Sequence, residues 1–269
     1  MSDTLASRQK EYELIVETIL AKHLPKIIRI DGKCFSQYLS SAEQPFDSTV
    51  LLSMIAAASE LMKHIGGTAR FAYIQSDECS IVLNDNLHET CQSWLGSRVQ
   101  KVTSIAASIF TAGFNASYRK LKNDPDLPAG YFDCRYFSVP NLTEVLNNML
   151  WRQQDALRNG VNKYARHYFS AKELHGVSIA QTVEKLRERG VILEMTPMWT
   201  LRGVVLPSSN SVDFQIPLFH ARTDESYLTN LYNVASVGLI EEENGTPNRG
   251  ERPSTNPSGE IPDTISEQA

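Results

Sequence analysis

The stretch from Phe71 to Leu83 constrains the fold more than any other part of the chain. It contains two runs of strand-forming residues that meet at two adjacent acids, Asp77 and Glu78. This pattern predicts a β-hairpin with carboxylates at its tip. An earlier strand-like run, residues 26–30, ends on Asp31. A strand end and a hairpin tip can place Asp31 beside Asp77, which is the arrangement that two hard divalent cations need when they handle a nucleoside triphosphate.

The periodicity around the hairpin predicts a β-α-β-β-α-β order. Asp47 is placed to cap a helix that Gly66 ends, and a second helix is expected from about His88 to Ala112, with Gly113 at its end. The next strand is expected at residues 131–139. This is the ferredoxin-like α+β order of a polymerase or cyclase palm, with added helices and a β-containing C-terminal extension. In that order the first strand lies at the sheet centre, adjacent to the strand that delivers Asp77.

The rest of the chain predicts helices before and after this unit. A helix or arm covers Leu5 to His23, and a long helix begins at Asn141 and runs towards Tyr168. Ser178 and Gln181 form a capping-box pattern for another helix, which Gly190 ends. A pair of strands is expected between Val191 and Leu206. We therefore expect a palm-like catalytic domain at 1–140, a helical and β extension at 141–240 that serves RNA, nucleotide or subunit contacts, and a disordered acidic tail at 241–269.

The charge distribution leaves a nucleic-acid partner open. The chain has a net charge of −5, but the segment from Glu241 onward contains seven acids and two arginines and accounts for all of it. No apolar run is long enough to cross a bilayer and the N-terminus is polar, so we expect a cytoplasmic protein without a membrane partner. The four cysteines form no CxxC pair, which argues against a structural zinc site and suits a reducing compartment.

Five ordered motifs between about residues 25 and 180 resemble the tRNAHis guanylyltransferase family. They are Arg29-Ile30-Asp31-Gly32, Pro45-Phe46-Asp47, Gln75-Ser76-Asp77-Glu78, Phe132-Asp133-Cys134-Arg135 and Trp151-Arg152-Gln153-Gln154-Asp155. Members of that family extend tRNA at its 5′ end, in the 3′-to-5′ direction, and their catalytic domain is similar to the palm of polymerases and nucleotide cyclases. The resemblance implies a nucleotidyltransferase that uses two Mg²⁺ ions, GTP and ATP, and a tRNA substrate. It also implies that the chain forms a homo-oligomer, and relatives in the family suggest a tetramer.

The resemblance assigns roles to individual residues. Asp31 and Asp77, with the carbonyl of Gly32, would hold the metal ions, and Glu78 and Ser76 would border them. The family carries its triphosphate-binding groups at positions that match the backbone of Lys33, Cys34 and Phe35 and the side chains of Arg98 and Lys101. The candidates for contact with RNA or a second nucleotide are Arg152, Arg158, Asn159 and Lys172.

Two departures from the family pattern refine this expectation. The eukaryotic enzymes carry His-Ile-Asn-Asn-Leu-Tyr-Asn in the window where this chain reads Leu-Arg-Asn-Gly-Val-Asn-Lys, residues 157–163. Gln44 also stands where a lysine often precedes the Pro-Phe-Asp motif. The sequence in this window is similar to that of the template-dependent members of the family, which repair truncated tRNA by Watson–Crick addition. Both strict G addition to tRNAHis and templated repair therefore stay open.

Each functional interpretation has a simpler alternative. An Asp-Gly after a strand is commonly only a turn, and Arg98 with Lys101, or the polar side of the helix around Trp151, could be a solvated or subunit-contact face. For Asp133 and Arg135 we prefer a mutual pair that braces the sheet. His175 next to a glycine is more often structural than catalytic.

Two competing functions are also compatible with the pattern. A palm with the same two metal ions could make a cyclic or small signalling nucleotide, in which case the chain beyond Trp151 would have no RNA to hold. An RNA-recognition module would need exposed aromatic residues on its central strands. The first strand has none and ends on an acid, so the module ranks below both enzymes.

Overall fold

The structure is a computed structural model, and it describes residues 4–86, 90–209, 212–213 and 232. The expected acidic tail at 241–269 lies outside these residues. The elements are α1 Leu5–Leu14, β1 Lys26–Gly32, α2 Phe35–Tyr38, α3 Ser48–Ile65, β2 Ala69–Gln75, β3 Glu78–Leu83, η1 Trp94–Ser97, α4 Val99–Lys122, β4 Phe132–Ser138, α5 Leu142–Tyr168, α6 Ala171–Leu174, α7 Ile179–Glu188, η2 Leu193–Met195, α8 Trp199–Arg202 and β5 Val204–Pro207.

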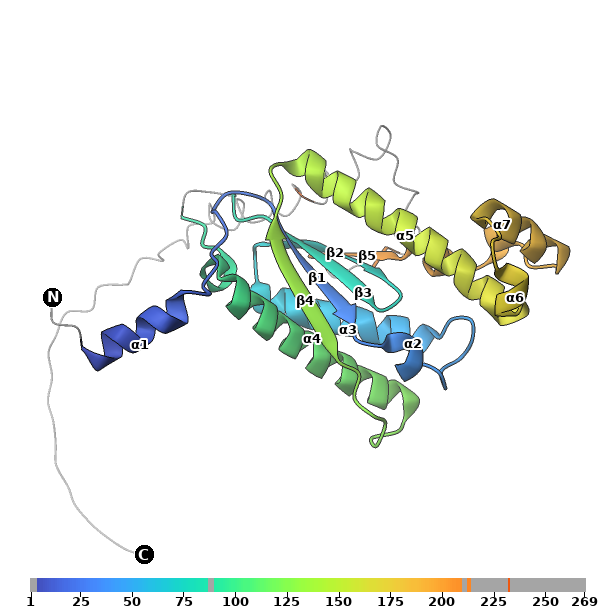
Figure 1. The fold of residues 1–269 in the computed structure, drawn as a ribbon, viewed down its shortest axis with the longest axis horizontal. Helices are drawn as coiled ribbons and strands as arrows, with labels where there is room; N and C mark the ends of the chain where they lie inside the picture. The colour runs from blue at the N-terminus through green and yellow to red at the C-terminus, as the bar shows by residue number, and fades with distance from the viewer. Residues whose placement is uncertain (1–3, 87–89, 210–211, 214–231, 233–269) are drawn as a thin grey trace, which may run out of the picture.

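The strands form one antiparallel sheet in the order β4-β1-β3-β2-β5 (Figure 1). The β-α-β-β-α-β order expected from the sequence is confirmed, and β1 lies between β4 and the middle strand β3. The strand β5 comes from the C-terminal part of the chain and pairs with β2. The sheet therefore includes a strand from beyond residue 140.

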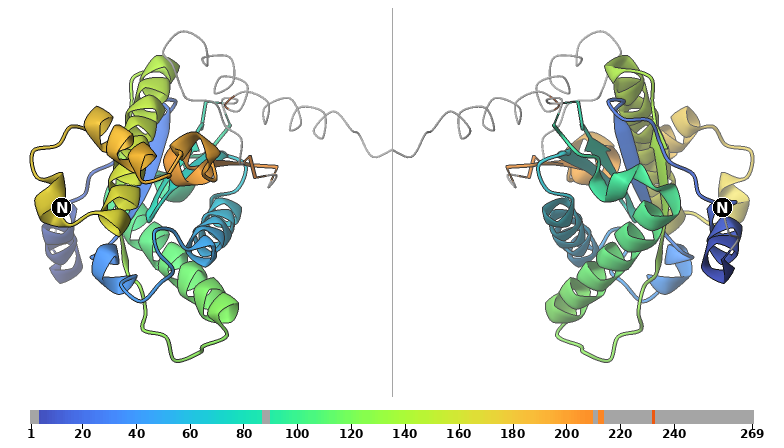
Figure 2. Two further views of the ribbon diagram at one scale, coloured as in Figure 1. Left: turned by 90° about the vertical axis from the view of Figure 1, so that its right-hand side faces the viewer. Right: turned by 90° about the vertical axis from the view of Figure 1, so that its left-hand side faces the viewer.

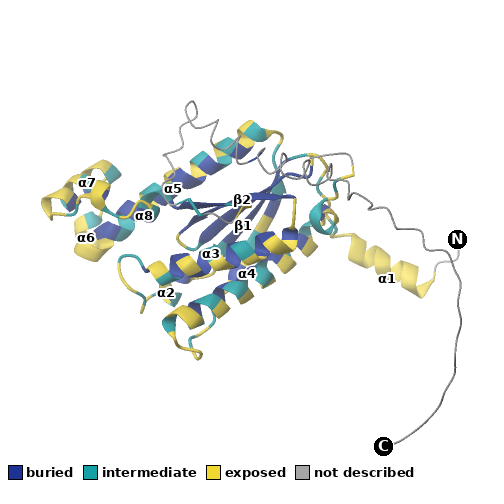
Figure 3. Cartoon of the chain, turned by 180° about the vertical axis from the view of Figure 1, so that it is seen from behind, coloured by how far each residue is buried: buried dark blue, intermediate teal, exposed yellow. Residues whose placement is uncertain are grey.

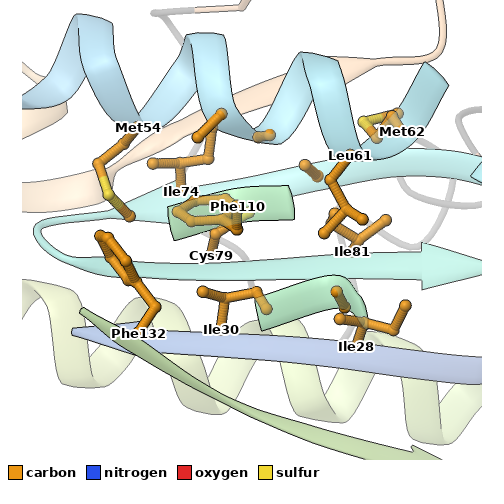
Figure 4. Close-up of a cluster of buried hydrophobic side chains, with 14 of the residues drawn as sticks. Ile28, Ile30, Met54, Leu61, Met62, Ile74, Cys79, Ile81, Phe110 and Phe132 are labelled. Carbon is orange, nitrogen blue, oxygen red and sulfur yellow. The ribbon is translucent and has the colours of Figure 1, made fainter. Parts of the chain in front are cut away.

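The helices α3 and α4 cover one face of the sheet and enclose the main hydrophobic core. Alternate residues of the central strands, such as Ile28 and Ile30, point into this core and are fully buried. Figure 4 shows Met54 and Leu61 of α3 above Ile74 and other strand side chains. As expected, Asp47 caps α3 by accepting a hydrogen bond from the Thr49 amide. This face is a conventional apolar interior.

The long helix α5 covers the other face, as the two side views in Figure 2 show. Its first half packs Val145 and Met149 on Ile27, Val82 and other apolar strand residues. Its second half leaves the apolar part of the sheet and packs with α7 and α8 around Val161, Tyr164 and Leu186. A polar part of the sheet face thus remains under the middle of α5.

The predicted bounds of α4 are wrong at both ends. Leu95, Gly96 and Ser97 have positive φ angles between 49° and 65°, which breaks the helical pattern before Val99. Gly113 does not end the helix but lies inside it, where an added Cβ would sit 3.2 Å from the Ala57 Cα of α3. The glycine is therefore required for close helix packing, and the left-handed Asn123 ends α4.

The expected strand pair at 191–206 is also wrong. Only β5 is a strand there, and the segment before it forms η2 and α8, because Pro197 starts a short helix rather than interrupting a strand. The expected N-terminal helix is shorter than predicted, and α1 has no buried residue (Figure 3). None of the helices within the described ranges is both long and apolar enough to pass through a membrane.

Candidate functional site

Four carboxylates gather at one end of the polar sheet face. Asp31 lies near the end of β1, directly opposite Glu78 of β3 and Asp133 of β4. The two-residue turn between β2 and β3 adds Asp77, and Ser76 in that turn is left-handed with φ of 50°. The Gly32 amide donates to the Asp77 carbonyl at 3.1 Å, which ties the end of β1 to the hairpin tip. The strand end and the hairpin tip meet as the sequence predicts.

Gly32 allows a close approach between the two acids. A Cβ at this position would lie 2.9 Å from Asp77 Oδ2 and 2.4 Å from the Phe35 ring. The Asp77 carboxylate is therefore packed against the Asp31-Gly32 backbone, where any larger residue would displace it. Neither Asp31 nor Asp77 forms an ion pair with a described side chain.

Burial and mutual repulsion disfavour negative charge on these acids. Burial, followed by the charges of Asp77, Glu78 and Asp133, raises the pKa of Asp31 from 3.8 to about 6. Burial also raises the pKa values of Asp77 and Glu78, although Lys163 opposes the shift at Asp77 and Arg152 opposes it at Glu78. Crowded carboxylates with these properties are a site that a divalent cation would stabilise.

The raised pKa of Asp31 predicts a pH-dependent stability in the metal-free protein. Because the folded state binds this proton more tightly than the unfolded state, the destabilisation is fully present above about pH 6 and is relieved as the pH falls towards 3.8. At this partly exposed group, solvent screening limits the effect to about 1–2 kcal/mol. Urea unfolding at pH 7 and pH 5 gives the free energy of unfolding at each pH. Its change between the two pH values should be smaller in the Asp31→Asn variant than in the parent protein. An identical pH dependence in variant and parent would contradict it.

Glu78 is held by a buried ion pair rather than pointing freely into the site. Arg152 of α5 donates to Glu78 Oε2 at 2.7 Å and to Asp155 at 2.9 Å. The Arg152 and Glu78 side chains are only 8% and 9% exposed, and Glu78 Oε1 has no hydrogen-bond partner. The pair fastens α5 to the acidic end of the sheet. Arg152 therefore has a structural role, and its contact with RNA or a second nucleotide stays a prediction.

The acids lie in a cleft of about 890 Å³ that has a floor and two walls. The sheet forms the floor with Asp31, Asp77 and Glu78, the α2 wall contains Phe35 and Ser36, and α5 forms the other wall. The volume is in the range of ordinary small-molecule sites. Both walls therefore line the same cleft as the acids.

Two arginines stand side by side on the floor. Arg29 is directly opposite Arg135 in the β1–β4 pairing, and both line the cleft. Arg29 is 9% exposed, its Nε has no hydrogen-bond partner, and its guanidinium lies 5.7 Å from the Trp151 ring centroid. Adjacent like charges destabilise a sheet unless an anion lies between them. No ion pair between Asp133 and Arg135 is present in the described part of the chain, so the expected sheet-bracing pair is wrong.

The other residues predicted for the nucleotide site divide into two groups. Ser76 and Phe35 line the cleft. Lys33 and Cys34 are exposed next to the cleft. The Lys33 amide donates a hydrogen bond to the Tyr131 carbonyl at 2.8 Å. Only part of the predicted backbone cradle is therefore available to a ligand.

Arg98 and Lys101 are not in the cleft, which corrects the sequence-based expectation. The start of α4 lies near α1, at the opposite end of the sheet (Figure 1). Arg98 caps that start and forms a bidentate ion pair with Glu17 at 2.8 Å. Lys101 is one helical turn further along and acts electrostatically on the same glutamate. These cations do not reach the acids of their own chain.

The predicted contacts for RNA or a second nucleotide are also divided. Asn159 lines the cleft, whereas Arg158 points to Asp155 and Lys172 lies on α6 beyond the end of α5. His175 ends α6 and is outside the cleft lining, as its structural interpretation expects.

Sequence analysis missed four residues of the α5 wall. Asn162, Lys163, Arg166 and His167 line the cleft together with the predicted Asn159. They follow Asn159 by three, four, seven and eight residues, which is a usable signal because such positions share one helix face. Burial lowers the pKa of Lys163, while the charges of Asp77 and Asp47 raise it.

The donor set at the acids matches what Mg²⁺ accepts. Within the described residues there is no cluster of three or more His, Cys, Asp or Glu side chains arranged for a metal ion. Mg²⁺ in nucleotide enzymes is usually held by one or two carboxylates together with waters and substrate phosphates rather than by a complete protein cage. The unpaired carboxylates of Asp31 and Asp77, beside the Gly32 backbone, fit that description.

Comparison with known proteins identifies relatives over most of the chain. The family model described as tRNAHis guanylyltransferase matches residues 6–140. The tRNA(His) guanylyltransferase of Eremothecium gossypii is 30% identical over 159 residues, which span 56% of this chain and 63% of that protein.

Two solved structures resemble the chain more completely. A bacterial tRNA(His) guanylyltransferase-like protein in complex with ATP has a TM-score of 0.80 and 33% identity, and covers 85% of this chain and 99% of its own. A second bacterial structure of this description, in complex with GTP, has a TM-score of 0.70 and 30% identity over the same shares.

Proposed function

The chain belongs to the tRNAHis guanylyltransferase family and is therefore a nucleotidyltransferase that adds G to the 5′ end of tRNA, and from this premise we propose how its cleft performs the reaction. The observation that carries the proposal is the contact between the end of β1 and the β2–β3 turn, which places the unpaired Asp31 and Asp77 carboxylates together. We propose that these carboxylates and the Gly32 carbonyl hold two Mg²⁺ ions. When bound, the ions would lower the pKa of an attacking 3′-hydroxyl and neutralise the leaving phosphates.

The residues around the acids would position the substrates. Phosphoryl transfer needs orientation and charge neutralisation more than covalent help from the protein. Arg29 and Arg135 supply two adjacent positive charges on the floor, which suits a phosphate group. The buried Arg152–Glu78 pair keeps α5 at a fixed height above the acids, which limits how far the substrates can move.

The reaction is proposed to have two stages. The 5′-monophosphate of the RNA attacks the α-phosphorus of ATP, which releases pyrophosphate and leaves an adenylylated end. The 3′-oxygen of GTP then attacks the 5′-phosphorus of that end, its proton is lost, and AMP leaves. The support for these two substrates is that solved relatives of this chain bind ATP and GTP.

Two further expectations belong to this proposal. We propose that the protein works in the cytoplasm and as a homotetramer. The exposed side chains of Leu14, Ile15 and Val16, which are 57–77% exposed, support self-association through the N-terminal arm. Light scattering on the purified protein gives the oligomer mass, and a monomer at working concentration would contradict the tetramer.

The choice between specific and templated addition is tested with two RNAs. Purified protein is incubated with Mg²⁺, ATP and labelled GTP, and with either tRNAHis lacking its extra G or another tRNA shortened by one 5′ nucleotide opposite a C. Label in the shortened tRNA would favour templated repair, and label in tRNAHis alone would favour specific guanylylation. Label in neither, with folded protein, would contradict the proposal and favour synthesis of a small signalling nucleotide.

A further inference from the structure

One face of α5 presents a row of polar and basic side chains to the cleft. This row, which we call the α5 stripe, consists of Asn159, Asn162, Lys163, Arg166 and His167. Positions three or four residues apart lie on the same side of a helix. From Asn159 to His167 the helix rises about 12 Å, so the stripe extends well beyond the acids. It continues towards α6 and α7, and residues 152–202 contain nine Lys and Arg against five Asp and Glu.

The cations of the α5 stripe form no close ion pair within the described part of the chain, although the charges of Asp77 and Asp47 act on Lys163. Elsewhere on α5, Arg152 and Arg158 are both paired with Asp155. Among the described residues, neither Lys163 nor Arg166 forms an ion pair with an Asp or Glu. The stripe therefore presents two cations without a close ion-pair partner among the described residues, at the edge of a cleft that contains crowded carboxylates.

Lys163 is held in position by its surroundings. It is partly buried, and its ammonium lies 4.7 Å from the Phe46 ring centroid. Besides the cleft, Lys163 lines two small cavities of about 30 Å³ each, both of which also contact Phe46 and Trp199. The contact with the Phe46 ring and the partial burial of the side chain restrict the direction of the charge. A fixed ammonium loses little rotamer freedom when an anion binds.

We propose that Lys163 and Arg166 bind backbone phosphates at the 5′ end of the RNA substrate, on the wall across the cleft from the nucleotide. The inference rests on the proposed function, because it divides the two substrates between the two walls. We assign the metal-bound triphosphate to the α2 side of the cleft, because Phe35 of α2 lies against Gly32 beside the Asp77 carboxylate. A stripe of about 12 Å is longer than a single phosphate needs, so it suits a chain of several nucleotides.

The test measures RNA binding apart from catalysis. Lys163→Gln, Arg166→Gln and the matched control Lys120→Gln, which removes an exposed cation of α4 outside the cleft, are compared with the parent protein. Binding of a fluorescent 5′-monophosphorylated tRNA is measured in EDTA without nucleotide over a range of salt. Each stripe variant should bind about tenfold more weakly and lower the salt slope by about one, while Lys120→Gln stays near the parent.

A second measurement, the KM for GTP, distinguishes binding of RNA phosphates from binding of nucleotide phosphates. The KM for GTP at saturating RNA should stay within about twofold of the parent value for both stripe variants, and Lys163→Arg should retain most of the RNA affinity. A raised KM for GTP with unchanged RNA binding would overturn the proposal, because the stripe would then serve the nucleotide. Equal losses in Lys120→Gln would also overturn it. If the parent protein failed to guanylylate any RNA, the binding comparison would still stand on its own.

Discussion

Replacing Asp77 by Asn is expected to lower nucleotide addition by about a thousandfold or more, because a neutral amide cannot hold the proposed cation that stabilises the transferring phosphate. The fold should survive, since the side chain lies in a turn and its charge is disfavoured by burial. Single-turnover assays with labelled GTP measure the loss, and thermal melting measures the stability. The melting temperature should stay unchanged or rise.

Asp133→Asn is the matched control for this experiment. Asp133 is exposed on β4 and is the cross-strand neighbour of Asp31, so the variant removes one negative charge from the same sheet end without removing a proposed ligand. Its activity should stay within a few-fold of the parent. Comparable losses in Asp77→Asn and Asp133→Asn would mean that net charge at this edge matters and that Asp77 has no special role.

The largest effect on stability is expected from Arg152→Met. This change leaves Glu78 buried at 9% exposure without its positive partner, and an uncompensated buried charge typically costs about 3–5 kcal/mol. It also frees Asp155, which would then pair with Arg158 alone. Urea unfolding gives the difference in the free energy of unfolding between variant and parent.

The double variant Arg152→Met with Glu78→Gln separates charge from packing. Once Glu78 is neutral, no buried charge remains uncompensated, so most of the lost stability should return. If the double variant were as unstable as Arg152→Met alone, the destabilisation would come from packing around α5. Arg152→Met with less than about 1 kcal/mol of effect would contradict the role of the pair as the fastening between α5 and the sheet.

The catalytic end of the fold could be predicted because it depends on local chemistry. Alternating strand residues around Asp77 defined the hairpin, and the β-α-β-β-α-β order then required β1 to lie beside β3. The contact between Asp31 and Asp77 follows from that topology. The cap at Asp47 was equally local, since a short polar side chain before an apolar stripe is a reliable helix start.

The errors came from interactions that a local pattern does not contain. Arg98 was placed at the phosphates by resemblance, but β3 carries the chain about 20 Å away from the hairpin tip before α4 begins. Gly113 was read as a helix end because its close contact with Ala57 depends on how two helices cross. The α5 stripe shares a helix face with Asn159, a local signal, but that this face meets the cleft depends on contacts between residues far apart in sequence, such as the Arg152–Glu78 pair.

The most direct test of the central claim is a crystal structure of the protein with Mn²⁺ and a non-hydrolysable GTP analogue, with anomalous data collected at the manganese edge. The account predicts anomalous peaks within coordination distance of carboxylate oxygens of Asp31 and Asp77 when the analogue is bound. Manganese bound only by phosphates, away from both aspartates, would contradict the assignment of this cleft as a two-metal nucleotidyl-transfer site.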